Sequence, residues 1–119
     1  MNNKPIIVNL DTPAFVAWLA ACKKMCEDYD KANYPTLGSD ILIPNCGGRY
    51  IRINETSEEL DKPSNRPIRD SVWAFIDRTT GDVLKPASYK APAKHARGNI
   101  FDEKGGMGSM SSYGPAYLR

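Results

Sequence analysis

Five residues in the second half of the chain combine positive charge with an aromatic ring. They are Lys85, Tyr89, Lys90, Lys94 and Arg97. No aspartate or glutamate lies between positions 83 and 101. Lysine and arginine side chains can neutralise phosphates, and a tyrosine ring can stack on an unpaired base. The segment therefore predicts a nucleic-acid-binding surface. The alternative is an ordinary charged face that keeps the protein in solution.

The residue types needed for enzyme chemistry are sparse. His95 is the only histidine, and the chain has neither a Gly-x-Ser-x-Gly elbow nor a glycine-rich phosphate loop. Cys22, Cys26, Cys46 and His95 could together form a Cys₃His zinc site. However, two cysteines four apart within an apolar helical stripe are typical of small core residues. We therefore expect no enzymatic activity, no bound metal and no cofactor.

Length and composition indicate one small domain. The chain has 119 residues and a net charge of only +2, which argues against a protein that coats nucleic acid like a histone. The charge is unevenly distributed: residues 1–70 carry 9 basic and 10 acidic side chains, and residues 71–119 carry 7 and 4. We expect neither a membrane span nor a secretory signal. The odd number of cysteines, 3, argues against a disulfide framework and favours a reducing compartment.

A long amphipathic helix is expected near the N-terminus. Thr12 can cap it, Pro13 suits its first turn, and the pattern continues to about Lys31. Its apolar residues recur at spacings of three and four: Phe15, Trp18, Leu19, Cys22, Met25, Cys26 and Tyr29. Such a stripe is normally buried on a sheet. The alternative is a face that binds a helix of a partner.

The most apolar run predicts the central strand of that sheet. Residues 72–76 are all apolar, which favours a strand covered on both faces. Alternation places Trp73 and Phe75 on one face and the other three residues on the opposite face. A hairpin should follow, with Gly81 at a position that requires positive φ. The short return strand should end at Pro86, which cannot donate a ladder hydrogen bond.

Other elements are predicted around this hairpin. Three segments have the pattern of short strands: Pro5–Leu10, Asp40–Ile43 and Arg49–Asn54. In the last segment, Ile51 and Ile53 should face the core. Tyr50 and Arg52 on its outer face could extend the basic surface, or form an ordinary solvent face. Pro92 at a first turn predicts a short helix over Pro92–Arg97.

Two polar segments complete the chain. Residues 55–70 hold five acids, three bases and two prolines, which predicts a mobile loop or a hairpin extension. Residues 104–119 begin with glycine and serine, which is typical of a flexible tail. Its last aromatic and apolar side chains could dock on the body or remain disordered: Tyr113, Tyr117, Leu118 and Arg119. We therefore predict a single domain over residues 1–103 and a Gly/Ser-rich tail over residues 104–119.

The C-terminal half resembles small proteins encoded by tailed bacteriophages. The resemblance lies in the run GDVLKPASYKAPAKHARGNIFD and in the closing YGPAYLR. It covers about 50 residues, and it brings no known active site. It implies a phage origin and three possible roles: handling of nucleic acid, virion structure, or interference with a host protein.

Together these patterns predict an α+β fold, with one long N-terminal helix packed on an antiparallel sheet of three to five strands. We expect a non-enzymatic, phage-encoded accessory protein that binds nucleic acid through Lys85, Tyr89, Lys90, Lys94 and Arg97. The alternative is a structural or host-inhibiting module that binds a phage or host protein through its sheet edge or aromatic tail. Homo-oligomers are possible under either hypothesis. The expected location is the host cytoplasm or the virion, without membrane association.

Overall fold

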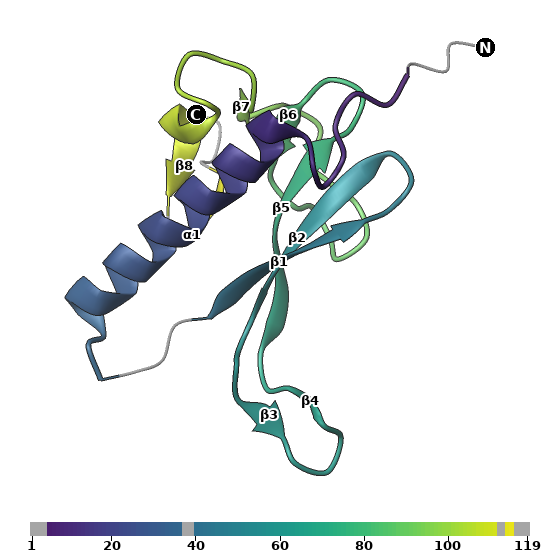
Figure 1. The fold of residues 1–119 in the computed structure, drawn as a ribbon. Coiled ribbons are helices and arrows are strands. Elements are labelled where there is room, and N and C mark those ends of the chain that lie inside the picture. The colour runs from purple at the N-terminus through teal and green to yellow at the C-terminus, as the bar shows by residue number, and fades with distance from the viewer. Residues whose placement is uncertain (1–4, 37–39, 112–113, 116–119) are drawn as a thin grey trace.

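The computed structural model describes residues 5–36, 40–111 and 114–115. One helix, α1 (Pro13–Asn33), lies against a five-stranded sheet (Figure 1). The strands follow the order β1 (Ile41–Cys46), β2 (Tyr50–Thr56), β5 (Asp70–Asp77), β6 (Asp82–Leu84) and β7 (Gly98–Asn99). Every neighbouring pair is antiparallel. The protein is therefore an α+β domain with an N-terminal helix, and the predicted fold class is confirmed.

Two small ribbons stand outside this sheet. One joins β3 (Leu60–Asp61) to β4 (Arg66–Pro67) and extends the β2–β5 hairpin. We call residues 58–68 the arm, because they project beyond the sheet (Figure 1). The other ribbon pairs β8 (Met110–Ser111) with β9 (Gly114–Pro115), directly after a short 3₁₀ helix, η1 (Met107–Ser109). Of the two predictions for residues 55–70, the hairpin extension is confirmed.

Helix α1 forms for the reason that its apolar spacing predicts. Phe15, Trp18, Cys22 and Cys26 are buried on one stripe, and the helix ends two residues after Lys31. Pro13 occupies the first turn. The expected cap is only partly correct. The Thr12 hydroxyl makes no hydrogen bond to the helix, and instead accepts one from the Asn9 backbone N–H at 2.7 Å.

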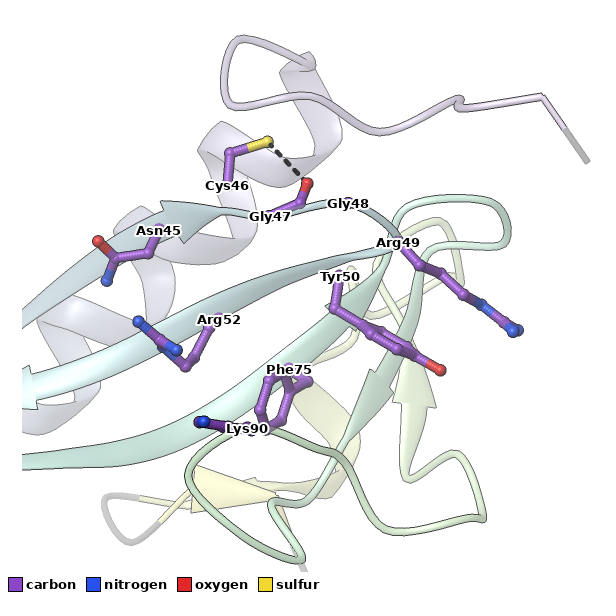
Figure 2. A pocket seen from close by; sticks show the side chains of 9 residues that line it. All are labelled: Asn45, Cys46, Gly47, Gly48, Arg49, Tyr50, Arg52, Phe75 and Lys90. Carbon is purple, nitrogen blue, oxygen red and sulfur yellow. Dashed lines mark hydrogen bonds between the residues drawn. The ribbon is translucent and has the colours of Figure 1, made fainter.

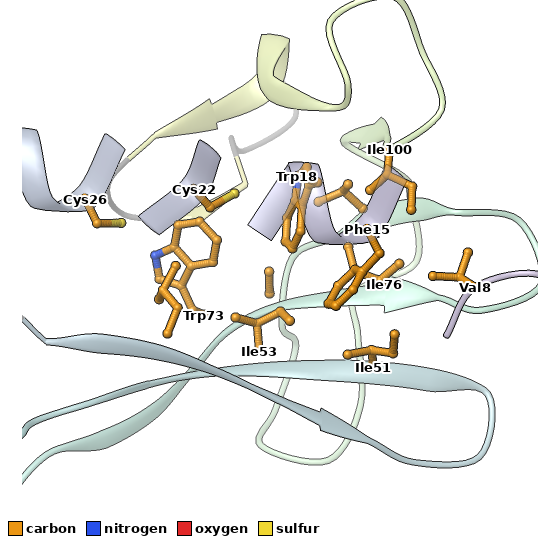
Figure 3. Close-up of a cluster of buried hydrophobic side chains, with 13 residues drawn as sticks. Val8, Phe15, Trp18, Cys22, Cys26, Ile51, Ile53, Trp73, Ile76 and Ile100 are labelled. Atoms are coloured by element: carbon orange, nitrogen blue, oxygen red, sulfur yellow. The ribbon is translucent and has the colours of Figure 1, made fainter. Parts of the chain in front are cut away.

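The core lies between this helix and the inner face of the sheet (Figure 3). As predicted, Ile51 and Ile53 are fully buried there. The predicted position of Trp73 is wrong, because Trp73 packs in the same core, 6.3 Å from Trp18 between ring centroids. The cause is an irregularity in the β2–β5 register, where Ile53 faces Ala74 but Asn54 faces Val72. The extra residue, Trp73, thereby turns towards the helix instead of alternating with its neighbours.

Phe75 lies on the opposite face, which we call the outer face. Phe75 is only 3% exposed, although no helix among the described residues covers that side. The covering comes from residues 85–97, which we call the strap: the Tyr89 hydroxyl contacts Asn54 of β2 at 3.2 Å, and Lys90 lies near Phe75 (Figure 2). The central strand is therefore covered on both faces, as its apolar sequence predicts.

The predicted helix over Pro92–Arg97 is wrong. This half of the strap runs back beside β6 in an extended form: the Ala93 N–H donates to the Lys85 carbonyl and the Arg97 N–H to the Val83 carbonyl, both at 2.7 Å. An isolated bridge also pairs Pro86 with Pro92. Since these backbone donors are bonded to another segment, they cannot form helical hydrogen bonds.

The predicted edge strand over Pro5–Leu10 is also wrong. The N–H groups of Ile7 and Val8 both donate to a single carbonyl, that of Arg78, at 2.8 and 3.0 Å. A strand ladder would divide these donors between two sides. The segment is instead anchored by the buried Val8 side chain and by the Arg78 guanidinium, which donates to the Val8 carbonyl at 3.0 Å.

The strand predicted over Asp40–Ile43 continues beyond its expected end. Pro44 lies within β1, opposite Ile53. Proline is tolerated here because β1 is the first strand of the sheet order, so its missing donor can face outward.

The described part of the tail packs on the body. Met107 and Met110 contact the core, and Gly114 adopts a positive φ of 99°. A Cβ at Gly114 would lie 2.7 Å from the Trp73 carbonyl oxygen, so this close approach requires glycine. Of the two alternatives for the tail, docking on the body therefore holds for the part that the structure describes. The residues named for docking lie outside the described residues: Tyr113, Tyr117, Leu118 and Arg119.

Candidate functional site

The structure brings only two of the five predicted nucleic-acid-binding residues together. Lys85 is half-buried, and its Nζ donates to the Pro115 carbonyl at 2.9 Å, so it anchors the tail. The Arg97 guanidinium donates to the carbonyl of His95, in its own segment. Lys94 is exposed on the strap. Only Tyr89 and Lys90 contribute to a cluster on the outer face.

That cluster is completed by arginine side chains from β2. The Arg52 guanidinium carbon lies 4.5 Å from the centre of the Tyr89 ring, which places the cation over the ring face. Arg49, just before β2, lies 5.4 Å from the centre of the Tyr50 ring. The alternating pattern of the sequence predicted that Tyr50 and Arg52 could extend the basic surface, but it did not identify Arg49.

Of these side chains, all but Tyr89 line a pocket of about 230 Å³, which we call the basic pocket. Figure 2 shows Arg52 and Lys90 towards one side of it and Arg49 towards the other, with Tyr50 and Phe75 between them. The rest of the lining comes from the end of β1 and the β1–β2 turn: Asn45, Cys46, Gly47 and Gly48. Three cations and two aromatic rings thus meet at one site, and no carboxylate is among the described residues that line it.

Arg52 is held by a hydrogen-bonded network. Its Nε donates to the Asn54 Oδ1 at 3.0 Å, and Asn45 Nδ2 donates to the same oxygen at 3.1 Å. Asn54 Nδ2 in turn donates to Asp70 Oδ1 at 2.9 Å and to the Tyr89 hydroxyl at 3.2 Å. Asn54 is only 2% exposed, so this amide is fixed on both sides. The network fixes the guanidinium through Nε and leaves both Nη groups without a hydrogen-bond partner among the described residues.

Arg49 is oriented by a buried carboxylate. Its Nη2 lies 3.0 Å from Asp77 Oδ2, while Asp77 Oδ1 accepts bonds from the Thr79 N–H and hydroxyl at 2.9 and 2.7 Å. Burial alone would raise the pKa of Asp77, but the bonds from Thr79 and Arg49 outweigh it and hold that pKa below its ordinary value. Asp77 therefore remains ionised at neutral pH and keeps Arg49 at the rim of the pocket.

A further arginine supports the β1–β2 turn at the rim of the pocket. Arg78 Nη1 donates to the carbonyls of Gly47 and Gly48 at 2.8 and 2.9 Å. The backbone N–H of Arg78 also donates to the Arg49 carbonyl at 2.9 Å. Arg78 thus positions the pocket without lining it. The sequence carries no signal for this role, since these backbone oxygens belong to residues 29 to 31 positions away.

The cysteines occupy separate places. Cys22 and Cys26 lie in the core, where burial raises the pKa of both thiols, that of Cys26 to about 12. Such thiols stay protonated and are poor nucleophiles and metal ligands at neutral pH. Cys46 is exposed at the β1–β2 turn, and His95 is exposed on the strap. Within the described ranges, no three side chains of the histidine, cysteine, aspartate or glutamate types are grouped as metal ligands.

The fold and the pocket together define a small α+β domain with a basic, aromatic surface site. Residues 17–114 match the model of DUF7717, a family of unknown function, and the chain belongs to this family. No curated protein and no solved structure matches the chain. In the part of the chain that the structure covers, no helix has the length and apolar character needed to cross a membrane.

Proposed function

We propose that the protein binds single-stranded nucleic acid, without catalysis, on the outer face around the basic pocket. The observation that carries this proposal is the placement of Arg52 over Tyr89, beside Lys90 and Arg49. Cations beside aromatic rings are the usual means of binding unpaired strands: the cations contact phosphates, and the rings and guanidinium planes stack on bases. Lys94 adds a further cation on the same strap.

The shape of the site favours a single strand over a duplex. The basic pocket is concave and small, and its aromatic floor lies between the strap and the β1–β2 turn. The bases of a duplex are stacked inside it and could not reach this floor, whereas an unpaired base can enter.

The acidic side chains of the arm do not oppose this surface. The arm leaves the sheet where Thr56 pairs with Asp70, whereas the pocket lies where Tyr50 pairs with Asp77. At about 3.3 Å per residue, the lining residue of β2 nearest the arm, Arg52, is separated from Thr56 by about 13 Å of strand. At ordinary ionic strength this distance exceeds the Debye length, so the charges of the arm are largely screened from the pocket.

Fluorescence anisotropy tests the proposal. A labelled single strand of about ten nucleotides and the matching duplex would be titrated across a salt series from about 50 to 300 mM. We expect binding that favours the single strand and weakens as salt rises, because counterion release drives the association. The double variant Arg52→Ala/Lys90→Ala should lose most of the affinity, while Lys62→Ala on the arm should bind like the wild type. Absence of binding at the lowest salt would refute the proposal.

A second candidate function is protein binding through the arm and the sheet edge. Leu60 and Ile68 on the arm are 45% and 52% exposed, and Ile41 and Ile43 on β1 are 40% and 39% exposed. The resemblance to phage proteins would make the partner a host protein or a virion component. Light scattering after size-exclusion chromatography would show this function as a mass that rises with protein concentration or with an added partner. Substitution of Leu60 and Ile68 by serine should abolish that rise.

A further inference from the structure

The basic pocket is too small for a strand to pass through it with several nucleotides inside. Its volume of about 230 Å³ lies below the ~300 to 1,000 Å³ of pockets that enclose whole small ligands. The turn at Gly47 and Gly48 limits it on one side, and Lys90 of the strap limits it on the other (Figure 2). This space suits one phosphate with part of its nucleoside. A strand end can enter more easily than an internal nucleotide, which carries neighbours on both sides.

The charge in the pocket also suits a terminal phosphate. Arg49, Arg52 and Lys90 contribute three positive charges, of which one is paired with Asp77. A terminal phosphate monoester carries about −1.5 to −2 charges near neutral pH, whereas each internal phosphate diester carries one. The two remaining positive charges therefore match the monoester better than the diester.

Arg52 supplies the geometry for such a group. Stacking on Tyr89 and the bond from Nε to Asn54 hold the guanidinium in one orientation. Its two Nη groups form the planar pair of donors that binds two phosphate oxygens at once. The buried polar network around Asn54 holds Arg52 in this orientation, and a purely apolar outer face would not need such a network. A pair of donors that is fixed in advance suits a ligand with two adjacent acceptors.

We propose that the basic pocket binds the terminal phosphate of a single strand, with Arg52 as a two-pronged donor and Lys90 as a point charge. This inference depends on the proposed binding of single strands and adds a preference for phosphorylated ends. The pocket geometry applies equally to a 5′- and a 3′-phosphate, and the experiment separates them.

The test compares three oligonucleotides of one sequence and about ten nucleotides, each labelled internally, by fluorescence anisotropy. One carries a 5′-phosphate, one a 3′-phosphate, and one has hydroxyl groups at both ends. We expect at least one of the phosphorylated strands to bind about tenfold more tightly than the hydroxyl-ended strand, which is the size of one strong charge-assisted contact.

Variants connect that preference to Arg52. Arg52→Lys keeps the charge but loses the planar pair of donors, so affinity should fall for all three strands. The ratio of the affinities for the phosphorylated and the hydroxyl-ended strand should fall towards one. Lys62→Ala on the arm should keep the full preference, and thermal unfolding should show that both variants are folded. Equal affinity of the wild type for all three strands would overturn this inference and leave the proposed function standing. A preference unchanged in Arg52→Lys would also overturn it, and absence of binding to every strand would overturn both proposals.

Discussion

The two faces of the sheet are covered by different kinds of contact. The inner face packs apolar side chains such as Ile51 and Ile53 against Trp18 of α1. The outer face instead holds a polar network in which the buried Asn54 bonds to Asp70, Tyr89 and Arg52. Apolar burial stabilises a fold without regard to direction, whereas a hydrogen-bonded network fixes particular side chains in place. The comparison indicates that the inner face maintains the domain and that the outer face positions a binding site.

The largest predicted effect concerns the inner face. Trp18→Ala removes an aromatic side chain that is 2% exposed and packs against Phe15 and Trp73. We expect the free energy of unfolding to fall by about 3 to 5 kcal/mol, measured by chemical denaturation. Leu60→Ala on the exposed arm is the matched control and should change it by less than about 0.5 kcal/mol. Similar losses for both variants would contradict the assignment of the core.

A variant of the outer face should separate the effect of side-chain orientation on binding from the effect of charge. Asn54→Ala leaves every cation in place but removes the amide that fixes Arg52 and Tyr89. Because the Arg52 Nε and the Tyr89 hydroxyl lose a partner, we expect a stability loss of about 1 to 2 kcal/mol. We also expect weaker affinity for a single strand, measured by anisotropy on the folded variant. Unchanged affinity would show that the orientation of Arg52 does not matter for binding.

Asp77→Asn should give a stability change that depends on pH. The folded pKa of Asp77 lies below its ordinary value of 3.8, so the ionised carboxylate stabilises the fold above that pH. This contribution is lost as pH falls below 3.8 towards the folded value. Relative to the wild type, the variant should lose about 1 to 2 kcal/mol at neutral pH and progressively less below pH 3.8. Denaturation at several pH values tests this, and a difference that does not change with pH would contradict it.

The smallest predicted effect is a gain in stability, whereas the variants above lose stability. Burial, and then the nearby carboxylates of Asp40 and Asp30, raise the pKa of Glu55 above its ordinary value of 4.5. Ionisation of Glu55 therefore costs stability as pH rises through the folded value. Glu55→Gln should raise the midpoint of thermal unfolding slightly at neutral pH and have little effect below pH 4.5. Glu103→Gln, at an exposed loop position, serves as a charge-matched control.

Local patterns were sufficient to predict most of the fold. The helical spacing of Phe15, Trp18 and Cys22 depends only on residues near one another in the chain, and it placed α1 within two residues at its C-terminal end. The position of Trp73 could not be predicted in this way, because it depends on an irregular pairing between two strands that the arm separates along the chain. Periodicity describes the faces of one strand, whereas a bulge is a property of a pair of strands.

The candidate site was predicted only in part for a related reason. Charge density indicated Lys90 and Tyr89, but their grouping with Arg52 requires the strap to lie across a strand more than 30 positions earlier in the chain. Lys85 has the same charge as Lys90, yet its ammonium group is bonded to the Pro115 carbonyl. Charge in a sequence therefore indicates that a basic surface exists, while the tertiary contacts determine which of its cations form a site.

Nuclear magnetic resonance of the ¹⁵N-labelled protein with an unlabelled single strand would test the central claim most directly. If the outer face carries the binding site, backbone amide shifts should change at residues 45–52 and 89–94 and remain constant in the arm, at residues 58–68. Changes confined to the arm or to α1, with none around the basic pocket, would contradict the account.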